Sequence, residues 1–336
     1  MHPVILAIES SCDETSASVI VHGKVLNNVI ASQTVHHKYG GVVPELASRA
    51  HQQHILEVVN EAITQADILP ASLSAIAFTK GPGLMGSLLV GVSFAKGMAL
   101  ALGIPLIEVN HMEAHVLAHF INDPKPSFPF LCLTVSGGHT QLVKVTDYHL
   151  MEVIGETQDD AVGEAFDKAA KIMGLPYPGG PLIDKFAKEG NPKAYSFPET
   201  AMQGLNFSFS GIKTAFLYFL RDRVAEDPEF VAKNRNDICA SLQAHLITML
   251  MQKLRRASTE TGIKQIAIAG GVAANSGLRN AIREAAEKNR WEVFIPAFEY
   301  CTDNAAMIAM AAHYKFLRGK FTSLDVAPVA NLSIGI

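Results

Sequence analysis

The same local pattern opens each half of this chain, namely a strand, a polar turn and a second strand. The apolar stretches that flank the turns are residues 4–8 and 17–21 in the first half, and 130–135 and 141–145 in the second. Stretches of this kind, bounded by turn residues, are typical of paired strands. Because the pattern recurs, the sequence predicts two related α/β halves that face one cleft.

The first turn, residues 9–16, is rich in carboxylates and hydroxyls. Placing such groups between two buried strands is costly unless they face a cleft, so Asp13 and Glu14 are candidates for positioning a substrate group or water. Turns also favour Asp and Ser for purely local hydrogen bonding, and both interpretations stay open. We expect a third strand at 25–30 to complete a meander.

Between and after these openings, strands alternate with helices. The expected helices are 44–66, 86–102, a segment from His111, 161–173, 237–261 and 304–317, and further strands are 75–79, 104–109, 265–269 and 291–296. Ser210 is the expected N-cap of a helix that carries Ile212 and Phe216. Three prolines in residues 122–129 interrupt the pattern and predict a domain boundary there.

Composition excludes several classes of protein. With 336 residues, 49% hydrophobic and 18% charged, the chain resembles a soluble enzyme of about two domains. The apolar run at 84–105 contains Lys96 and several glycines, which favours a buried helix over a membrane span. The N-terminus enters a strand directly, which predicts a cytoplasmic protein, and the four scattered cysteines predict free thiols. A net charge of -4 does not indicate nucleic-acid binding, so any phosphate contacts need a local basic patch or another subunit.

Two histidines, His111 and His115, lie four residues apart. At about 3.6 residues per turn they share one helical face and are within reach of a single metal ion. A third ligand must come from elsewhere, and Asp303 is the best candidate because it sits where a strand gives way to a helix. The alternative is an ordinary helix that carries two histidines.

Glycine turns provide a second group of candidate residues. The turn 136–140 contains Gly137 and Gly138, whose backbone amides can approach a phosphate, although a ligand-free hairpin has the same pattern. Strand 265–269, a Gly-Gly turn and a helix start form a second such arrangement. Asp167 and Asp184 are candidate acceptors for a ribose diol, or ordinary surface carboxylates. The Pro- and Gly-rich run 176–181 is expected to be irregular.

Eight short motifs occur in the order of a known family. They are ESSCDET at 9–15, GGVVPELASR at 40–49, GPGL at 81–84, HMEAH at 111–115, VSGGHT at 135–140, YPGGP at 177–181, FSFSG at 207–211 and CTDN at 301–304. From about residue 4 to about residue 318 the chain resembles the bacterial TsaD family of tRNA threonylcarbamoyladenosine transferases. Each motif is weak alone, but eight in order are specific.

This resemblance implies the actin-like, Hsp70-like and sugar-kinase-like (ASKHA) α/β fold. It implies one subdomain at 1–122, completed by the C-terminal helix 304–320, and another at 127–303. It implies transfer of a threonylcarbamoyl group from threonylcarbamoyl-AMP to the exocyclic amine of the adenosine beside the anticodon, in tRNAs that read ANN codons. The implied partners are tRNA, the paralogous subunit TsaB and the ATPase TsaE, and no membrane.

By the same resemblance, His111, His115 and Asp303 hold one Fe²⁺ or Zn²⁺ ion. The residues implied for the adenylate pocket are Thr134, Val135, Ser136, Gly137, Gly138, Asp167, Gly180, Asp184 and Asn275. A carbamoyl-adenylate already carries AMP as a leaving group, so orientation and charge stabilisation are enough, with no covalent enzyme nucleophile. Asp13 or Glu14 is the candidate acceptor of the amine proton.

Two other enzyme classes compete with this interpretation. A metallopeptidase of the H-E-x-x-H type needs its Glu directly after the first His, whereas Glu113 lies two residues after His111 and about 200° round the helix. A kinase or ATPase of the same fold has no role for the two histidines and Asp303. A non-catalytic scaffold is disfavoured because all three candidate ligands are present.

Overall fold

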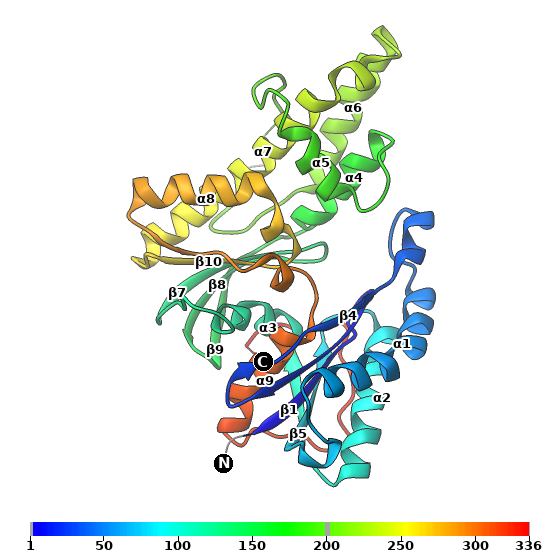
Figure 1. Cartoon of the computed structure of the whole chain (residues 1–336). Helices are drawn as coiled ribbons and strands as arrows, with labels where there is room; N and C mark the ends of the chain where they lie inside the picture. Colours follow the sequence, from blue (N-terminus) through cyan, green and yellow to red (C-terminus); the bar gives the residue numbers. More distant parts are fainter. Residues whose placement is uncertain (1–2, 199–201, 336) are drawn as a thin grey trace. The chain divides into compact units, whose positions relative to one another are not determined.

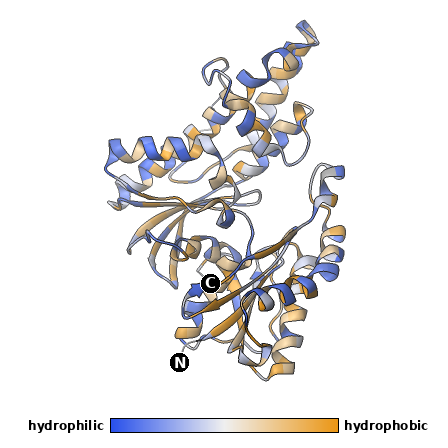
Figure 2. Cartoon of the chain, viewed as in Figure 1, coloured by the Kyte–Doolittle hydropathy of each residue, from blue (hydrophilic) through white to orange (hydrophobic). Residues whose placement is uncertain are grey.

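The computed structural model describes residues 3–198 and 202–335, which form two compact units (Figure 1). The first unit comprises the chain up to residue 126 together with 146–152 and 296 onward, and the second comprises 127–145 and 153–295. Each unit is built around one sheet, and Figure 2 shows the strands of both sheets as mainly hydrophobic.

The sheet of the first unit combines antiparallel and parallel pairing. Its strands are β1 (Val4–Glu9), β2 (Glu14–Val21), β3 (Lys24–Val25), β4 (Val29–Ser32), β5 (Ala75–Gly81) and β6 (Leu106–Asn110). The order is β3-β2-β1-β5-β6; β1 pairs antiparallel with β2 and parallel with β5, and β5 pairs parallel with β6. The carboxyl ends of β1, β5 and β6 therefore lie at one edge of the sheet, and that edge carries the candidate site.

The predicted third strand at 25–30 is wrong in detail, because it is divided into β3 and β4, which both pair with β2. Two asparagine side chains separate them. Asn27 accepts a hydrogen bond from the backbone N–H of Val19 at 3.0 Å and donates to the carbonyl oxygen of Ala62 at 2.6 Å. Asn28 accepts from the Ser16 hydroxyl at 3.5 Å. These side-chain bonds replace ladder bonds where the strand is interrupted.

Helices cover both faces of this sheet. Helix α1 (Pro44–Gln65) packs on β2 and α2, and α2 (Met85–Leu102) packs on β5. Helix α9 (Ala305–Leu317) packs on β1 and β2, beside which it lies in Figure 1, and on the short α3 (His111–Leu117). Alternation along β1 separates the two layers: Leu6 and Ile8 belong to the core under α1 and α2, and the intervening residues point to the other face.

Helix α2 is the one helix among the described residues that is long and apolar enough to cross a membrane. The prediction that it is buried holds for only one face, where Leu88, Val92 and Ala95 join the core. An adjoining face exposes Leu89 by 48% and Leu100 by 68%. Only 33% of the helix is buried. Helix α2 therefore packs against the core along one side and leaves apolar residues exposed on another.

The sheet of the second unit has the order β11-β10-β7-β8-β9. The strands are β7 (Phe130–Val135), β8 (Thr140–Asp147), β9 (Leu150–Glu156), β10 (Gln265–Ala269) and β11 (Glu292–Phe294). The helices are α4 (Val162–Ile172), α5 (Gly179–Ala187), α6 (Ser210–Glu226), α7 (Phe230–Thr261) and α8 (Ser276–Asn289). Parallel pairing of β7 with β10 brings the two predicted glycine turns, at 136–140 and 270–271, to the same sheet edge.

Three helix starts differ from the prediction. Helix α7 begins at Phe230, seven residues before the predicted Asp237. The run 176–181, predicted to be irregular, contains the first turn of α5, because Pro181 stands where a helix needs no N–H donor. Ser210 is the first residue of α6, and its N-cap is Phe209. The capping acceptor comes from Asp159, which accepts from the backbone N–H of Phe209 at 2.7 Å and of Ser210 at 3.2 Å.

Candidate functional site

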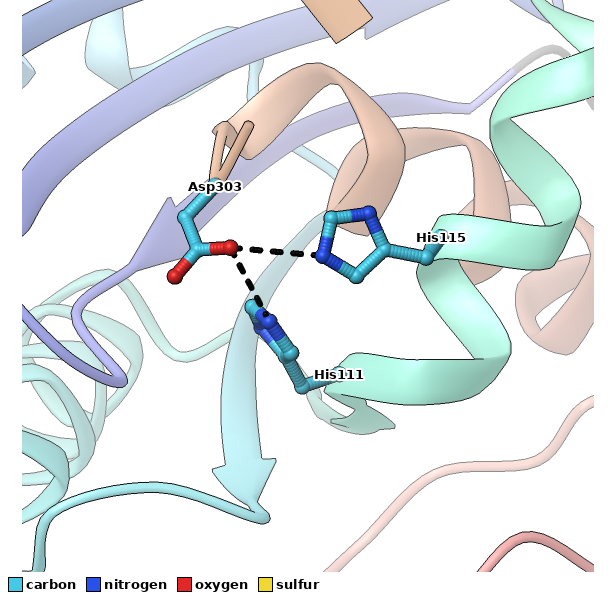
Figure 3. Close-up of side chains that lie close together, drawn as sticks. All are labelled: His111, His115 and Asp303. Atoms are coloured by element: carbon cyan, nitrogen blue, oxygen red, sulfur yellow. Dashed lines mark hydrogen bonds and ion pairs between the residues drawn. The ribbon is translucent and has the colours of Figure 1, made fainter. Parts of the chain in front are cut away.

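The three predicted metal ligands converge in the first unit (Figure 3). Nε2 of His111 lies 3.2 Å from Oδ1 of Asp303, and Nε2 of His115 lies 3.3 Å from the same oxygen. The two imidazole rings are nearly perpendicular, at 89°, with centroids 4.7 Å apart. One ligand atom from each residue lies within 4.8 Å of the others, which is a spacing that one ion can bridge.

Local structure fixes the helix that presents the histidines. Asn110, the last residue of β6, caps α3 by accepting from the backbone N–H groups of Met112 and Glu113 at 2.9 and 3.3 Å. Its side-chain amide also donates to the carbonyl oxygen of Ser333 at 2.8 Å. The C-terminal segment after α9 therefore helps to hold α3 in place.

Asp303 comes from the loop before α9, whose N-cap Asn304 accepts from the backbone N–H of Met307 at 3.0 Å. The Ser16 hydroxyl in β2 accepts from the N–H of Ala305 at 2.9 Å. Since β2 and the start of α9 are tied directly, the Asp303 carboxylate is held on the sheet that also carries α3.

A fourth ionisable group, Glu9 at the end of β1, lies against His111 and is fully buried. Its Oε2 accepts from Nδ1 of His111 at 3.0 Å and from the Thr79 hydroxyl at 2.6 Å, and its Oε1 accepts from the backbone N–H of Ser11 at 2.5 Å. The Ser11 hydroxyl is 3.2 Å from the same Nδ1. Glu9 is not among the site residues predicted from the sequence, where its position at the carboxyl end of a buried strand was the available signal.

These contacts perturb the pKa values of the cluster. Burial alone would lower the pKa of His111, but Asp303 and Glu9 raise it well above its ordinary value. Burial opposes ionisation of Asp303 and Glu9, yet His111 holds the pKa of each carboxyl below its ordinary value. Burial lowers the pKa of His115. Without a metal ion, a proton on His111 thus balances part of the two carboxylate charges.

The donor set fits a divalent transition metal. Two imidazole nitrogens and one carboxylate oxygen form a ligand type that suits iron or zinc and leaves coordination positions for a substrate. Nδ1 of His115 is buried and has no hydrogen-bond partner among the described residues, so Nε2 is the nitrogen through which this ring meets Asp303. Glu113 points elsewhere, since its Oε1 accepts from the backbone N–H of Gly335 at 3.3 Å. A peptidase-like base beside the ligands is therefore absent at this position.

The carboxylate-rich turn contains both predicted proton acceptors. Asp13 lies in the turn between β1 and β2, and Glu14 is the first residue of β2. Burial, together with the nearby Asp303 and Asp13 carboxylates, raises the pKa of Glu14 to about 10. The turn is fixed by the carbonyl oxygen of Cys12, which is 3.0 Å from Nε2 of His51 in α1 and accepts from the Ser87 hydroxyl in α2 at 3.1 Å.

In the second unit, the Ser136 turn closes on itself. The N–H of Ser136 donates to the carbonyl oxygen of His139 at 2.8 Å, and the N–H of His139 donates to the Ser136 hydroxyl at 3.0 Å. The Ser136 amide is therefore already used within the turn. At Gly137 and Gly138, a Cβ would meet no atom within 4 Å, so one side of this turn is open. Thr134 and Val135 belong to β7 just before it.

The opposite side of the turn is tightly packed. A Cβ at Gly163, in the first turn of α4, would lie 2.5 Å from the carbonyl oxygen of Ser136. A Cβ at Gly270, where φ is +89°, would lie 2.4 Å from the carbonyl oxygen of Val135. Glycine is thus required at both positions so that α4 and the end of β10 can approach β7.

The remaining predicted pocket residues link helix N-termini. Asp167 in α4 accepts from the backbone N–H groups of Gly179 and Gly180 at 2.8 and 3.1 Å. Asp184 in α5 accepts from the hydroxyl and N–H of Ser276 at 2.8 and 3.2 Å. Asn275 is the N-cap of α8 and accepts from Leu278 N–H at 2.9 Å. Asp167 and Asp184 are therefore engaged within the protein, whatever hydroxyls they also bind.

Comparisons with known proteins agree on one family. A family model described as TsaD, tRNA N6-adenosine threonylcarbamoyltransferase, matches residues 24–310. A protein of that name from Cytophaga hutchinsonii is 63% identical over 335 residues, covering 100% of this chain and 98% of the relative. A protein of the same name from Christiangramia forsetii is 63% identical over 325 residues, covering 96% of each chain.

Among solved structures, full-length HypF in its phosphate- and nucleotide-bound form matches with a TM-score of 0.64 at 12% identity. The match covers 94% of this chain and 46% of HypF. At such low identity the likeness concerns the fold alone. The prediction of an ASKHA-like α/β fold is confirmed.

Proposed function

The chain belongs to the TsaD family of tRNA N6-adenosine threonylcarbamoyltransferases, and we propose how its two units perform that reaction. The donor is threonylcarbamoyl-AMP, and the acceptor is the exocyclic amine of the adenosine beside the anticodon in tRNAs that read ANN codons. The observation that carries the proposal is the convergence of His111, His115 and Asp303 in a chain 63% identical to named transferases along its whole length.

The reaction forms a bond between the adenosine nitrogen and the carbamoyl carbon and breaks the bond from that carbon to the AMP oxygen. The amine loses one proton, and AMP leaves with the electron pair of the broken bond. Because the donor is already activated, the protein needs to orient the reactants, exclude water and stabilise charge on the oxygens.

The second unit binds the donor in this proposal. A Cβ at Gly137 or Gly138 would meet no atom within 4 Å, so a phosphate can approach the backbone amides there, whereas the Ser136 amide is used inside the turn. Asp167, Gly180 and Asn275 surround the nucleoside, supported by their ties to the N-termini of α5 and α8. Asp184 contributes a weaker contact, because Ser276 already occupies both of its oxygens.

His111, His115 and Asp303 would hold one Fe²⁺ or Zn²⁺ ion in the first unit. Such an ion supplies a Lewis acid and a template for substrate oxygens. The protein's own contribution is to keep the two Nε2 atoms and Oδ1 of Asp303 directed at one point. Asp13 or Glu14 is the proposed acceptor of the amine proton. In the metal-free protein, burial and the nearby Asp303 and Asp13 carboxylates raise the pKa of Glu14 to about 10, which favours Asp13 for this role.

The proposed partners are tRNA, the paralogous subunit TsaB and the ATPase TsaE, in the cytoplasm and away from membranes. The uncovered side of α2, with Leu89 and Leu100, supports docking of a protein subunit there. The formal charge of -4 supports a contribution of other subunits to tRNA binding. We also propose two ASKHA subdomains, one at 1–122 with 304–320 and the other at 127–303. The compact units differ from these bounds, because residues 146–152 and 296–303 belong to the first unit.

The test is transfer of labelled threonylcarbamoyl to unmodified tRNA, with and without the partner subunits. We expect modification by the parent protein and its loss in His111→Ala, together with loss of bound metal. The control is His54→Ala, a histidine of α1 outside the cluster, which should retain both properties. Equal activity and equal metal content in parent and His111→Ala would contradict the proposed role of the metal site.

A further inference from the structure

Glu9 contacts one of the candidate metal ligands, His111, and is held in place by two further hydrogen bonds. It is completely buried, and three donors from three segments meet its two oxygens: Nδ1 of His111 at 3.0 Å, the Thr79 hydroxyl at 2.6 Å and Ser11 N–H at 2.5 Å. All three segments lie at the carboxyl edge of the β1, β5 and β6 strands. The carboxylate is thereby held in one orientation, facing the ring of His111.

This contact decides which nitrogen of His111 can bind an ion. An ionised carboxylate only accepts hydrogen bonds, so Nδ1 of His111 carries a hydrogen. The lone pair available for coordination is then on Nε2, which is the atom 3.2 Å from Oδ1 of Asp303. A histidine that binds metal through one nitrogen commonly donates its other N–H to a carboxylate, which fixes the tautomer and the ring plane.

The charges of the cluster agree with the same role. When both histidines coordinate an ion as neutral imidazoles, Asp303 and Glu9 each contribute one negative charge and the imidazoles contribute none. A divalent cation would bring the sum of these groups to zero. An unbalanced charge in a buried site is costly, so the second carboxylate favours a doubly charged ion over an ion of lower charge.

We propose that Glu9 is a positioning residue for the metal centre, which holds the His111 ring for coordination through Nε2 and balances the charge of a divalent ion. This inference rests on the metal site of the proposed function. His115 provides an internal contrast, because its buried Nδ1 has no partner among the described residues. The carboxylate contact is therefore specific to His111. Removing it should weaken metal binding by that histidine and leave His115 unaffected.

The experiment measures the Zn²⁺ affinity of metal-free protein by competition with a chromogenic chelator. Glu9→Gln keeps the size of the side chain and removes its charge, and we expect the affinity to fall about 10–100-fold. Glu113→Gln is the matched control on α3, because its carboxylate binds Gly335 and does not contact the three ligands; its affinity should equal that of the parent. The absorption spectrum of the Co²⁺-loaded protein should change in Glu9→Gln and stay unchanged in Glu113→Gln.

A second variant keeps the proposal testable if Glu9→Gln does not fold. Thr79→Val keeps Glu9 but removes the hydroxyl that holds its Oε2, and we expect a smaller loss of Zn²⁺ affinity in a folded protein. Folding is checked for every variant by circular dichroism and thermal unfolding. If Glu9→Gln folds and binds Zn²⁺ within twofold of the parent, the proposal is overturned. If it does not fold, unchanged affinity in Thr79→Val overturns the proposal.

His111→Ala separates this inference from the proposed function. If His111→Ala loses Zn²⁺ while Glu9→Gln keeps it, the metal site stands and only the role of Glu9 fails. If His111→Ala also retains the parent affinity, the metal site itself is refuted, and the inference fails with it.

Discussion

Both units carry candidate site residues at the carboxyl ends of their strands, but one site is built from side chains and the other from a backbone turn. The first unit uses ionisable side chains: His111 and Glu9 are buried, and Asp303 is partly exposed. The second uses a backbone turn whose open side needs the absence of side chains at Gly137 and Gly138. The first site therefore depends on the charges and ligand atoms of its side chains. The second depends on how closely neighbouring backbone segments approach one another.

Removing a charged side chain should have the largest effect. Asp303→Ala leaves two imidazoles with no shared carboxylate, and we expect Zn²⁺ affinity to fall by about 100-fold or more. Chelator competition measures the loss. Binding of AMP, measured by calorimetry, should not change, because the proposed nucleotide residues lie in the second unit. If Asp303→Ala lost affinity for Zn²⁺ and for AMP to the same extent, the two units would not be separate binding regions.

In the second unit, the corresponding change is the addition of one methyl group at a glycine. In Gly163→Ala the new Cβ would lie 2.5 Å from the carbonyl oxygen of Ser136, so we expect the free energy of unfolding to fall by about 1–3 kcal/mol. Gly137→Ala meets no atom and should change stability by less than about 0.5 kcal/mol, yet weaken AMP binding. Urea unfolding and calorimetry measure the two effects. Equal stability losses in the two variants would contradict the packing argument.

The charged cluster should also give metal-free protein a pH optimum. The pKa of His111 is raised from 6.5, so its contribution is complete below pH 6.5 and is lost as the pH rises through its folded-state pKa. The pKa values of Asp303 and Glu9 are lowered from 3.8 and 4.5, so their contributions are complete above pH 4.5 and are lost on acidification. We therefore expect greatest stability between pH 4.5 and 6.5. Thermal unfolding across pH measures it, and Zn²⁺ should flatten the alkaline decline.

The smallest expected effect comes from Glu14. Because its pKa is raised from 4.5 to about 10, its stability contribution is present at low pH and diminishes as the pH rises through about 10. Glu14→Gln keeps a neutral side chain at every pH, so the alkaline decline of the metal-free protein should become shallower. Melting temperatures at pH 6 and pH 9 measure the difference. A steeper decline in the variant would show that the carboxyl is ionised in the folded protein.

The sequence predicted the side-chain site better than the backbone site. The spacing of His111 and His115 and the strand-to-helix position of Asp303 were sufficient to group three residues that the structure brings together. Glu9 was missed because its role depends on the pairing of β1 with β5 and of β5 with β6, which brings Thr79 and His111 beside it. In the second unit, spacing indicated the Gly-Gly turn, but only tertiary contacts show that Asp167 and Asp184 bind α5 and α8 N-termini.

The distance in sequence between the ligands has a consequence for biosynthesis. His115 and Asp303 are 188 residues apart, and the chain between them contains the whole of the second unit. At typical translation rates of about 5–20 residues per second, the two histidines leave the ribosome roughly 10–40 s before the aspartate. Of the three ligands, the nascent chain holds only the two imidazoles during that interval. Stable loading of the ion therefore belongs to the finished polypeptide, and a chain interrupted anywhere before residue 303 lacks the carboxylate that completes the site.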